Sequence, residues 1–278
     1  MEEKMKFSTF VIGLIITLAI LTFYTAFPFS AFFYASQVLS TTGAVIVVPL
    51  VTIAVVYRLI VITTQRVLHL SMEEIGIPQP KMDRKWLIIG LLLPLTILVI
   101  YLLMPGQLSV ANNNQARLIS LLGCIFVEGF LPGILEEMIF RGLLMHLVAK
   151  RFGMTVAVVV PSVLFAALHL VNGALDAASM LMLFIGGTAV GIMFSLITLV
   201  KNSIWNSAVV HGLWDFFIIG IFNFTAKPDL FNLYSYHVAS QNILISGGAF
   251  GIEPSLICTI AYLLVAYVAY LEIRKNKI

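Results

Sequence analysis

Eight apolar segments divide the chain, and each is long enough to cross a membrane as a helix. They lie at about 7–28, 38–62, 86–104, 117–149, 154–172, 178–200, 202–222 and 255–273. Because an α-helix rises 1.5 Å per residue, roughly 18 to 25 apolar residues cross the ~30 Å hydrocarbon core of a bilayer. Hydrophobic residues make up 60% of the chain and charged residues 10%, whereas about a quarter of a soluble domain is charged. The sequence therefore predicts an all-α, polytopic membrane protein of about eight transmembrane helices.

The fourth segment is longer than one straight span requires, and it contains Pro132 and Gly133. Proline removes a backbone hydrogen bond and often kinks a helix, so we expect a kink or break there. The longest connections, near 63–85 and 223–254, are too short to form a core of their own. We therefore expect residues 1–278 to form a single membrane domain.

Lysine and arginine residues gather in alternate connections between the apolar segments. One side has Lys4, Lys6, Arg66, Lys81, Arg84, Lys85, Lys150, Arg151, Lys201, Arg274, Lys275 and Lys277, and the other has Arg117 and Lys227. Since positive residues favour the cytoplasmic side, we expect a multi-pass protein of the cell membrane with both termini in the cytoplasm. The first segment is longer than the apolar part of a signal peptide, which favours an uncleaved anchor.

Few ionisable residues lie within the apolar segments away from their ends. They are Glu128, Glu136, Glu137, Arg141, His146, His169, His211 and Asp215. A charged side chain at the centre of a bilayer costs roughly 2.5–3.5 kcal/mol on insertion scales, so such residues usually face the bundle interior and mark a site or a pathway. Neither Cys124 nor Cys258 has the spacing of a metal or redox motif, and no basic patch indicates a nucleic-acid partner.

Helical spacing groups most of these residues into pairs. Glu137 and Arg141 are four residues apart, as are Phe165 and His169, and His211 and Asp215, and residues at this spacing share a helix face. Glu136 is rotated by about 100° from Glu137 and faces another neighbour. At 1.5 Å per residue from the basic ends, Glu136, His169, His211 and Asp215 all lie roughly 15–26 Å deep. We therefore expect the fourth, fifth and seventh segments to place them around one polar cavity, and we expect it to open towards the cytoplasmic leaflet.

Structural interpretations of the same residues remain open. One alternative is that Glu137 and Arg141 form only a buried ion pair, and His169 alone is more often an interhelical hydrogen-bonding residue. Another alternative is that His211 and Asp215 only form a hydrogen bond with each other. Glu128 and His146 are interpreted as structural, and the small-residue spacing of Gly187 and Gly191 is typical of a helix-packing face.

Three motifs carry a resemblance to a known family. EEMIFR at 136–141, FAALH at 165–169 and HGLWD at 211–215 resemble the EExxxR, FxxxH and HxxxN/D motifs of the CPBP intramembrane proteases, which include CAAX prenyl endopeptidases and bacteriocin-processing or immunity proteins. The similarity covers a protease core at about 117–222. SMEEIGIP, before the third segment, and FGIEPSLI, before the last, resemble less-defined features of bacterial members.

The resemblance implies a peptidase in which a glutamate activates water and no metal or other cofactor is required. By this resemblance, Glu136 is the base, His169 holds or polarises the water, and His211 with Asp215 stabilises the oxyanion. Arg141 pairs with Glu137, and Phe165 is a further supporting residue. The founding prenyl-protein enzymes have asparagine where this chain has Asp215. Because an ionised aspartate cannot donate a hydrogen bond, Asp215 is either protonated or orients His211 as an imidazolium.

Three other functions compete with this interpretation. The first is a zinc-dependent intramembrane protease, for which Glu136, His169 and His211 are a possible ligand set, although the chain has no HExxH motif. A membrane immunity or scaffold protein without peptidase activity is the second, and a transporter with a proton relay is the third, although the chain has no paired broken helices in two matching halves. For a peptidase, we expect a membrane-anchored or lipidated peptide as substrate and membrane lipid as surroundings.

Overall fold

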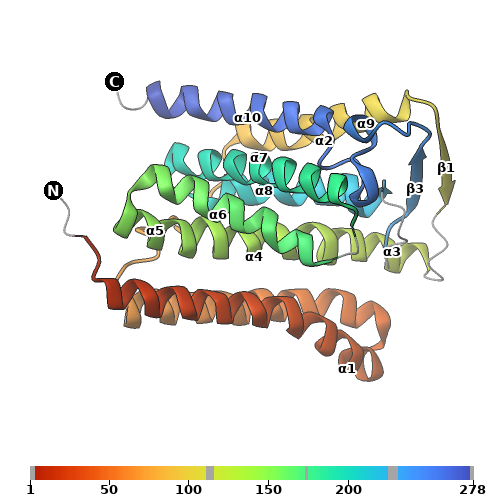
Figure 1. Cartoon of the computed structure of the whole chain (residues 1–278). Helices are drawn as coiled ribbons and strands as arrows, with labels where there is room; N and C mark the ends of the chain where they lie inside the picture. Colours follow the sequence, from red (N-terminus) through yellow and green to blue (C-terminus); the bar gives the residue numbers. More distant parts are fainter. Residues whose placement is uncertain (1–3, 111–115, 173–174, 225–230, 276–278) are drawn as a thin grey trace.

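The computed structural model describes residues 4–110, 116–172, 175–224 and 231–275 (Figure 1). The α-helices are α1 (Phe7–Ile62), α2 (Arg84–Leu102), α3 (Arg117–Gly123), α4 (Leu131–Glu136), α5 (Met145–Phe152), α6 (Met154–His169), α7 (Ala177–Lys201), α8 (Ile204–Asp215), α9 (Ile243–Ser246) and α10 (Leu256–Lys275). The π-helical segments are Thr63–Val67, Cys124–Phe130, Glu137–Leu144 and Phe216–Ile221, and Leu170–Asn172 and Gly248–Phe250 are 3-10 turns. The strands are β1 (Gly106–Val110), β2 (Phe222–Asn223) and β3 (Tyr234–Val238).

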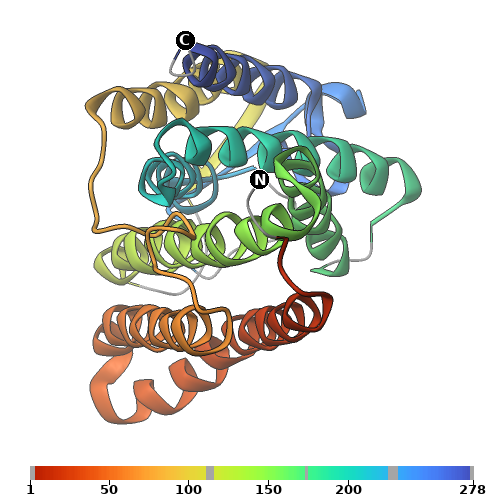
Figure 2. The same cartoon turned by 90° about the vertical axis from the view of Figure 1, so that its left-hand side faces the viewer.

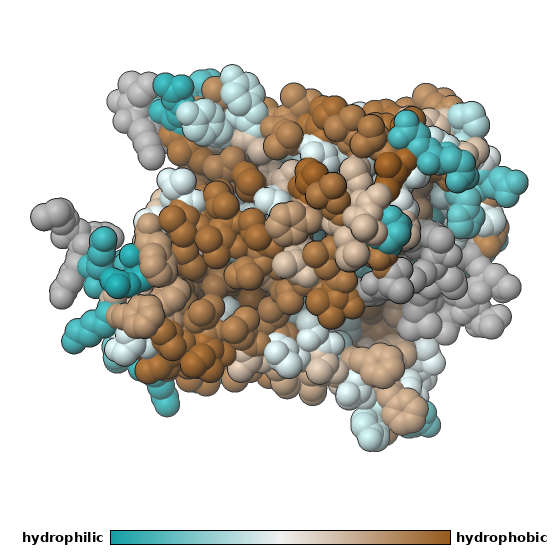
Figure 3. Space-filling model, in the orientation of Figure 1, coloured by the Kyte–Doolittle hydropathy of each residue, from teal (hydrophilic) through white to brown (hydrophobic). Residues whose placement is uncertain are grey.

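Apolar helices dominate the described part of the chain. Six helical stretches are long and apolar enough to cross a membrane, and α6 is a shorter apolar helix. Apolar side chains form a broad band on the surface between hydrophilic groups at the two ends (Figure 3). The protein is therefore an all-α, multi-pass membrane protein, as its composition predicts.

Two helices meet within α1. Ser40 has φ 67° and ψ 164°, so the helix breaks there, and the two halves lie antiparallel side by side (Figures 1 and 2). They match the first two predicted segments, and the other six predicted segments are also helical.

The helices pack in layers (Figure 2). The two halves of α1 form one outer layer, and α2 with α10 forms the opposite one. Between them, α4 packs against both α1 and α8, while α7 contacts α6, α8 and α10. The helices that carry the predicted site residues therefore lie between these two outer layers.

Of the kink or break expected at Pro132–Gly133, the break is wrong. Arg117–Phe152 is one helical stretch of 36 residues, and Leu131 keeps helical angles of φ −64° and ψ −58°. Pro132 falls in the first turn of α4, directly after a π-helical segment. A missing backbone N–H is tolerated best in a first turn, so the change from π to α hydrogen bonding accommodates the proline without a break.

A three-stranded sheet, which the sequence analysis did not predict, closes one end of the bundle. β3 pairs antiparallel with β1, from Gly106 opposite Val238 to Val110 opposite Tyr234, and parallel with β2. The Tyr236 hydroxyl donates to the Met104 carbonyl at 2.6 Å, which ties the sheet to the end of α2. The chain termini lie at the opposite end (Figure 1).

Basic residues of different connections meet at the end with the termini. Lys150 pairs with Glu74 at 3.6 Å, Lys201 pairs with Asp83 at 2.8 Å, and Lys85 pairs with Glu272. This clustering agrees with the one-sided charge distribution of the sequence. Two residues of that distribution, Lys227 and Lys277, lie outside the described residues.

Candidate active site

Glu137 and Arg141 form the predicted pair within one helix. Arg141 Nη1 lies 2.8 Å from Glu137 Oε1, and the two side chains are 1% and 0% exposed. Arg141 Nη2 also donates to the Gly191 carbonyl of α7 at 3.2 Å, and its guanidinium lies 4.6 Å from the ring centre of Phe165. The pair therefore joins the long helix to α6 and α7.

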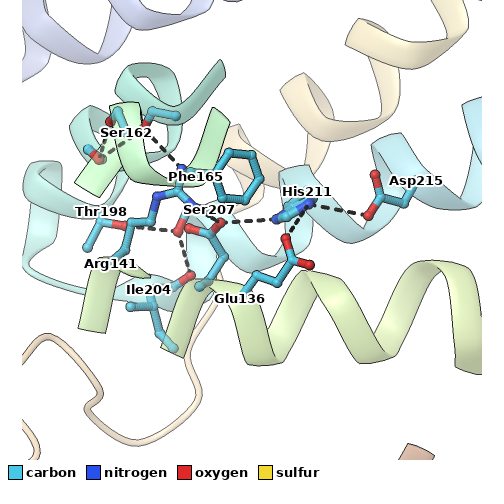
Figure 4. A network of polar contacts seen from close by, with 12 residues as sticks. Glu136, Arg141, Ser162, Phe165, Thr198, Ile204, Ser207, His211 and Asp215 are labelled. Atoms are coloured by element: carbon cyan, nitrogen blue, oxygen red, sulfur yellow. Dashed lines mark hydrogen bonds and ion pairs between the residues drawn. The ribbon is translucent and has the colours of Figure 1, made fainter. Parts of the chain in front are cut away.

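His211 lies between three carboxylates (Figure 4). Its Nδ1 is 3.0 Å from Glu137 Oε1, and its Nε2 is 3.3 Å from Asp215 Oδ2 and 3.8 Å from Glu136 Oε2. The Phe194 ring stacks on the imidazole at 4.5 Å. Since both ring nitrogens face acceptors, an imidazolium satisfies the geometry by donating from both. The sequence analysis assigned Glu137 to Arg141 alone and missed its contact with His211.

His169 is the last residue of α6. Its Nδ1 lies 2.8 Å from the Phe165 carbonyl, and the two rings are 4.7 Å apart. Because a carbonyl only accepts, Nδ1 carries the proton, and the neutral ring has its acceptor at Nε2. This is the state in which an imidazole can accept a hydrogen bond from a water molecule.

The four predicted catalytic residues line one cavity of about 220 Å³. Its lining includes Glu128, Glu136, Phe165, His169, Phe194, His211, Trp214, Asp215, Phe250, Glu253 and Tyr262. The expectation that Glu136, His169 and His211 meet is therefore confirmed. Glu128, interpreted as structural, also lines the cavity.

A glycine crossing brings the two motif helices together. A Cβ atom at Gly133 of α4 would lie 2.7 Å from the Gly212 Cα of α8, and one at Gly212 would lie 2.9 Å from the Gly129 carbonyl oxygen. Such an approach leaves no room for side chains. It is the contact that allows Glu136 to approach His211.

The position of the cavity conflicts with the expected orientation. His169 ends α6, and Phe250 and Glu253 precede α10, so these lining residues lie towards the sheet and away from the termini (Figure 1). If both termini are cytoplasmic, the cavity lies in the outer half of the bundle. The expected orientation and the expected opening towards the cytoplasmic leaflet are therefore incompatible.

Segments outside the motifs contribute site residues that the sequence analysis missed. The Tyr24 hydroxyl of α1 donates to Glu136 Oε1 at 3.1 Å. Glu253 accepts a hydrogen bond from Trp214 Nε1 at 3.0 Å. Nothing in the sequence around Tyr24 signals its role, whereas Glu253 belongs to the stretch FGIEPSLI, whose resemblance to bacterial members was noted without a role.

Two structural interpretations agree with the fold. The His146 ring nitrogens lie 2.9 Å from the Gly142 carbonyl and 2.8 Å from Asn202 Oδ1, away from the cavity lining. Gly187 and Gly191 of α7 pack against α6. Gly187 also lines the cavity.

Within the described residues, no group of three or more His, Cys, Asp or Glu side chains is arranged to hold a metal ion. The zinc alternative needs Glu136, His169 and His211 to converge on one point at ligand distance. These three side chains share the cavity without forming such a group.

The comparison with known proteins gives a match over the segment that contains the three motifs. Residues 118–217 match the sequence model of the family described as type II CAAX prenyl endopeptidase Rce1-like. No individual curated protein matches the chain significantly. Over this segment, which contains all three motifs, the chain is similar to the Rce1-like type II CAAX prenyl endopeptidases, and this match indicates that the chain is a peptidase.

Proposed function

We propose that this protein is a metal-independent, glutamate-dependent intramembrane endopeptidase that cleaves a membrane-associated or lipidated peptide. One observation carries the proposal: Glu136 lines an interior cavity with His169, and its Oε2 lies 3.8 Å from Nε2 of His211. The cavity thus combines a carboxylate with two imidazoles. These are the groups that water activation and oxyanion stabilisation require.

In the first step, Glu136 removes a proton from a water molecule as the water oxygen attacks the peptide carbonyl. Nε2 of His169 accepts the second hydrogen bond of that water and orients it. Tyr24 holds the Glu136 carboxylate from α1 at 3.1 Å.

In the tetrahedral intermediate, His211 donates from Nε2 to the oxyanion. Glu137 fixes the opposite nitrogen at 3.0 Å, so the ring cannot rotate away. Asp215, 3.3 Å from Nε2, orients the ring and balances its charge. In this role Asp215 only accepts a hydrogen bond, whereas the asparagine of the founding prenyl-protein enzymes can also donate one.

We further propose that residues 1–278 act as one membrane domain around a catalytic core at 117–222. Tyr24 lies before that core and Glu253 lies after it, and both contribute to the site. We place the protein in the cell membrane with both termini in the cytoplasm, which the charge distribution supports.

The test uses purified protein in lipid vesicles and an internally quenched CAAX peptide with a farnesylated cysteine. Wild type is expected to cleave the peptide, and Glu136→Gln is expected to lose at least about 100-fold in kcat, in the range typical for loss of a general base. Glu272→Gln, at the far end of α10, serves as a matched control with unchanged activity. Cleavage by Glu136→Gln at the wild-type rate would contradict the assignment of the base.

A chelator arm of the same assay tests metal independence. Activity is expected to survive EDTA and 1,10-phenanthroline, since neither the proposed base nor the oxyanion donors are metal ligands. Loss of activity that zinc restores would support the zinc alternative instead.

Natural substrates are identified by comparing membrane peptides of cells that contain wild type or Glu136→Gln. Fragments present only with wild type identify candidate substrates. Protection against a bacteriocin that persists in Glu136→Gln would favour the non-enzymatic immunity function.

A further inference from the structure

The connection before α10 forms part of the cavity wall, although it follows the family match by more than thirty residues. Phe250 and Glu253 of this connection line the cavity. Hydrogen bonds hold it to the bundle. Ala249 N–H donates to Ser179 Oγ of α7 at 3.0 Å, and the Tyr262 hydroxyl of α10 donates to the Glu253 carbonyl at 3.2 Å. This wall is therefore tied to two helices of the bundle.

The Glu253 carboxyl has a fixed position opposite the motif residues. Its Oε1 accepts from Trp214 Nε1 at 3.0 Å, and the indole of Trp214 is itself buried, with its ring 5.1 Å from that of Tyr262. Trp214 lies between His211 and Asp215 in the third motif. The motif helix thus holds Glu253 through a residue whose own side chain cannot act as an acid or base.

The environment of Glu253 raises the pKa of its carboxyl to about 7, so a substantial fraction of it is protonated near neutral pH. Burial is the largest cause, and the negative charge of Asp215 raises the pKa as well. The hydrogen bond from Trp214 and the nearby His169 and His211 lower the pKa. The titratable groups around it are Asp215 and His211 of α8, His169 of α6, Glu128 and Glu136 of the long helix, and Cys258 and Tyr262 of α10.

Glu136 and Glu253, two of the three glutamates that line the cavity, have opposite surroundings. Glu136 accepts from Tyr24 and faces Nε2 of His211, contacts that suit a carboxylate. Glu253 faces a neighbouring carboxylate, Asp215, and an apolar wall that includes Phe250. Two carboxyl groups held in such different environments can serve as base and acid in one reaction.

We propose that Glu253 is the general acid of the reaction, the group that protonates the amine released by peptide cleavage. This inference rests on the proposed peptidase function. Water attack forms the new C–O bond and leaves a proton on Glu136. As the tetrahedral intermediate collapses, the C–N bond breaks, and the nitrogen takes the proton of Glu253. Glu253 then regains a proton from Glu136 through water, so the enzyme returns to its starting state and the net reaction consumes one water molecule.

The decisive comparison pairs the farnesylated peptide with a matched thioester at the scissile bond. An amine must be protonated to leave, whereas a thiolate leaves without an acid, because thiols have pKa values of about 8.5. Glu253→Gln keeps an acceptor for Trp214 and so preserves the wall. It is expected to lose at least about 100-fold in kcat on the peptide and less than about tenfold on the thioester. Glu136→Gln is expected to lose both activities.

The pH profile gives a second readout. A general acid must be protonated, so kcat/KM for the peptide is expected to be highest below the pKa of Glu253 and to fall as the pH rises through about 7. Glu253→Gln removes this alkaline limb. Trp214→Phe removes a hydrogen bond that lowers the pKa, so it is expected to move the limb to higher pH. Glu272→Gln is the control that leaves the profile unchanged.

The outcomes separate this inference from the function on which it rests. If Glu253→Gln loses peptide and thioester cleavage equally, or loses neither, Glu253 is not the general acid, although Glu136 remains the base. If wild type cleaves neither substrate, or Glu136→Gln cleaves both at the wild-type rate, the proposed peptidase mechanism itself fails.

Discussion

Adjacent glutamates in EEMIFR have different partners. Glu136 lines the cavity and accepts from Tyr24, whereas Glu137 is fully buried and contacts both Arg141 and His211. A rotation of about 100° between neighbouring helix residues explains the separation. Glu137 therefore combines two functions, balancing the Arg141 charge and fixing the His211 ring.

Removing the Glu137 charge is expected to destabilise the protein. Glu137→Gln leaves Arg141, which is 1% exposed, as a buried cation without a carboxylate, and the loss of a partner from a buried pair costs about 3–5 kcal/mol. The midpoint of thermal unfolding in detergent should fall. Glu137→Gln combined with Arg141→Met removes both charges and should recover part of the stability. An unchanged midpoint in Glu137→Gln would contradict the role of this pair.

Stability and activity are expected to separate in the double variant. Its unfolding midpoint should recover, yet peptide cleavage should remain impaired, because the carboxylate 3.0 Å from Nδ1 of His211 is still missing. The measurement compares kcat of Glu137→Gln with that of the double variant. Recovery of full activity would mean that Glu137 serves Arg141 only.

At the level of helices, the site depends on how closely α4 approaches α8. Glycines at the crossing bring the backbones together, and each helix carries part of the site, Glu136 on α4 and His211 on α8. A small increase in the separation of α4 and α8 would therefore lengthen the 3.8 Å distance between Glu136 Oε2 and His211 Nε2.

Gly133→Ala is expected to reduce both stability and activity. The added Cβ would lie 2.7 Å from the Gly212 Cα, a backbone atom that cannot turn aside, and overpacking costs about 1–3 kcal/mol. Gly142→Ala, in the same long helix, is the matched control, because its Cβ would meet the flexible end of Ile77. Its losses in unfolding midpoint and in kcat should be smaller, and equal losses would contradict the importance of the crossing.

For the whole molecule, the fold couples the location of the cavity to the orientation of the chain. The termini and the paired lysines lie at one end, and the sheet lies at the other, nearer the cavity (Figure 1). Whichever side of the membrane holds the termini, the cavity lies in the other half of the bundle.

Cysteine labelling tests the orientation. The natural cysteines Cys124 and Cys258 are buried, so single substitutions at exposed positions report their own location. Ser109→Cys in β1 should react with a membrane-impermeant maleimide in intact cells, and Lys275→Cys should react only after permeabilisation. The reverse pattern would place the termini outside and the cavity in the cytoplasmic half. Labelling of both from one side would contradict the arrangement of the ends.

The membrane-spanning class, the helical segments and the pairs within each motif follow from local patterns in the sequence. Apolar length predicts a span, and the 3.6-residue period predicts that Glu137 meets Arg141. The tertiary structure alone decided the contacts between helices: Tyr24 reaches Glu136 across 112 residues, and His211 reaches Glu137 across 74. It also decided that the helix continues through Pro132 and that Glu253 lines the cavity. Helical periodicity fixes neighbours within one helix, whereas the partner across an interface depends on which faces pack and how closely their backbones approach.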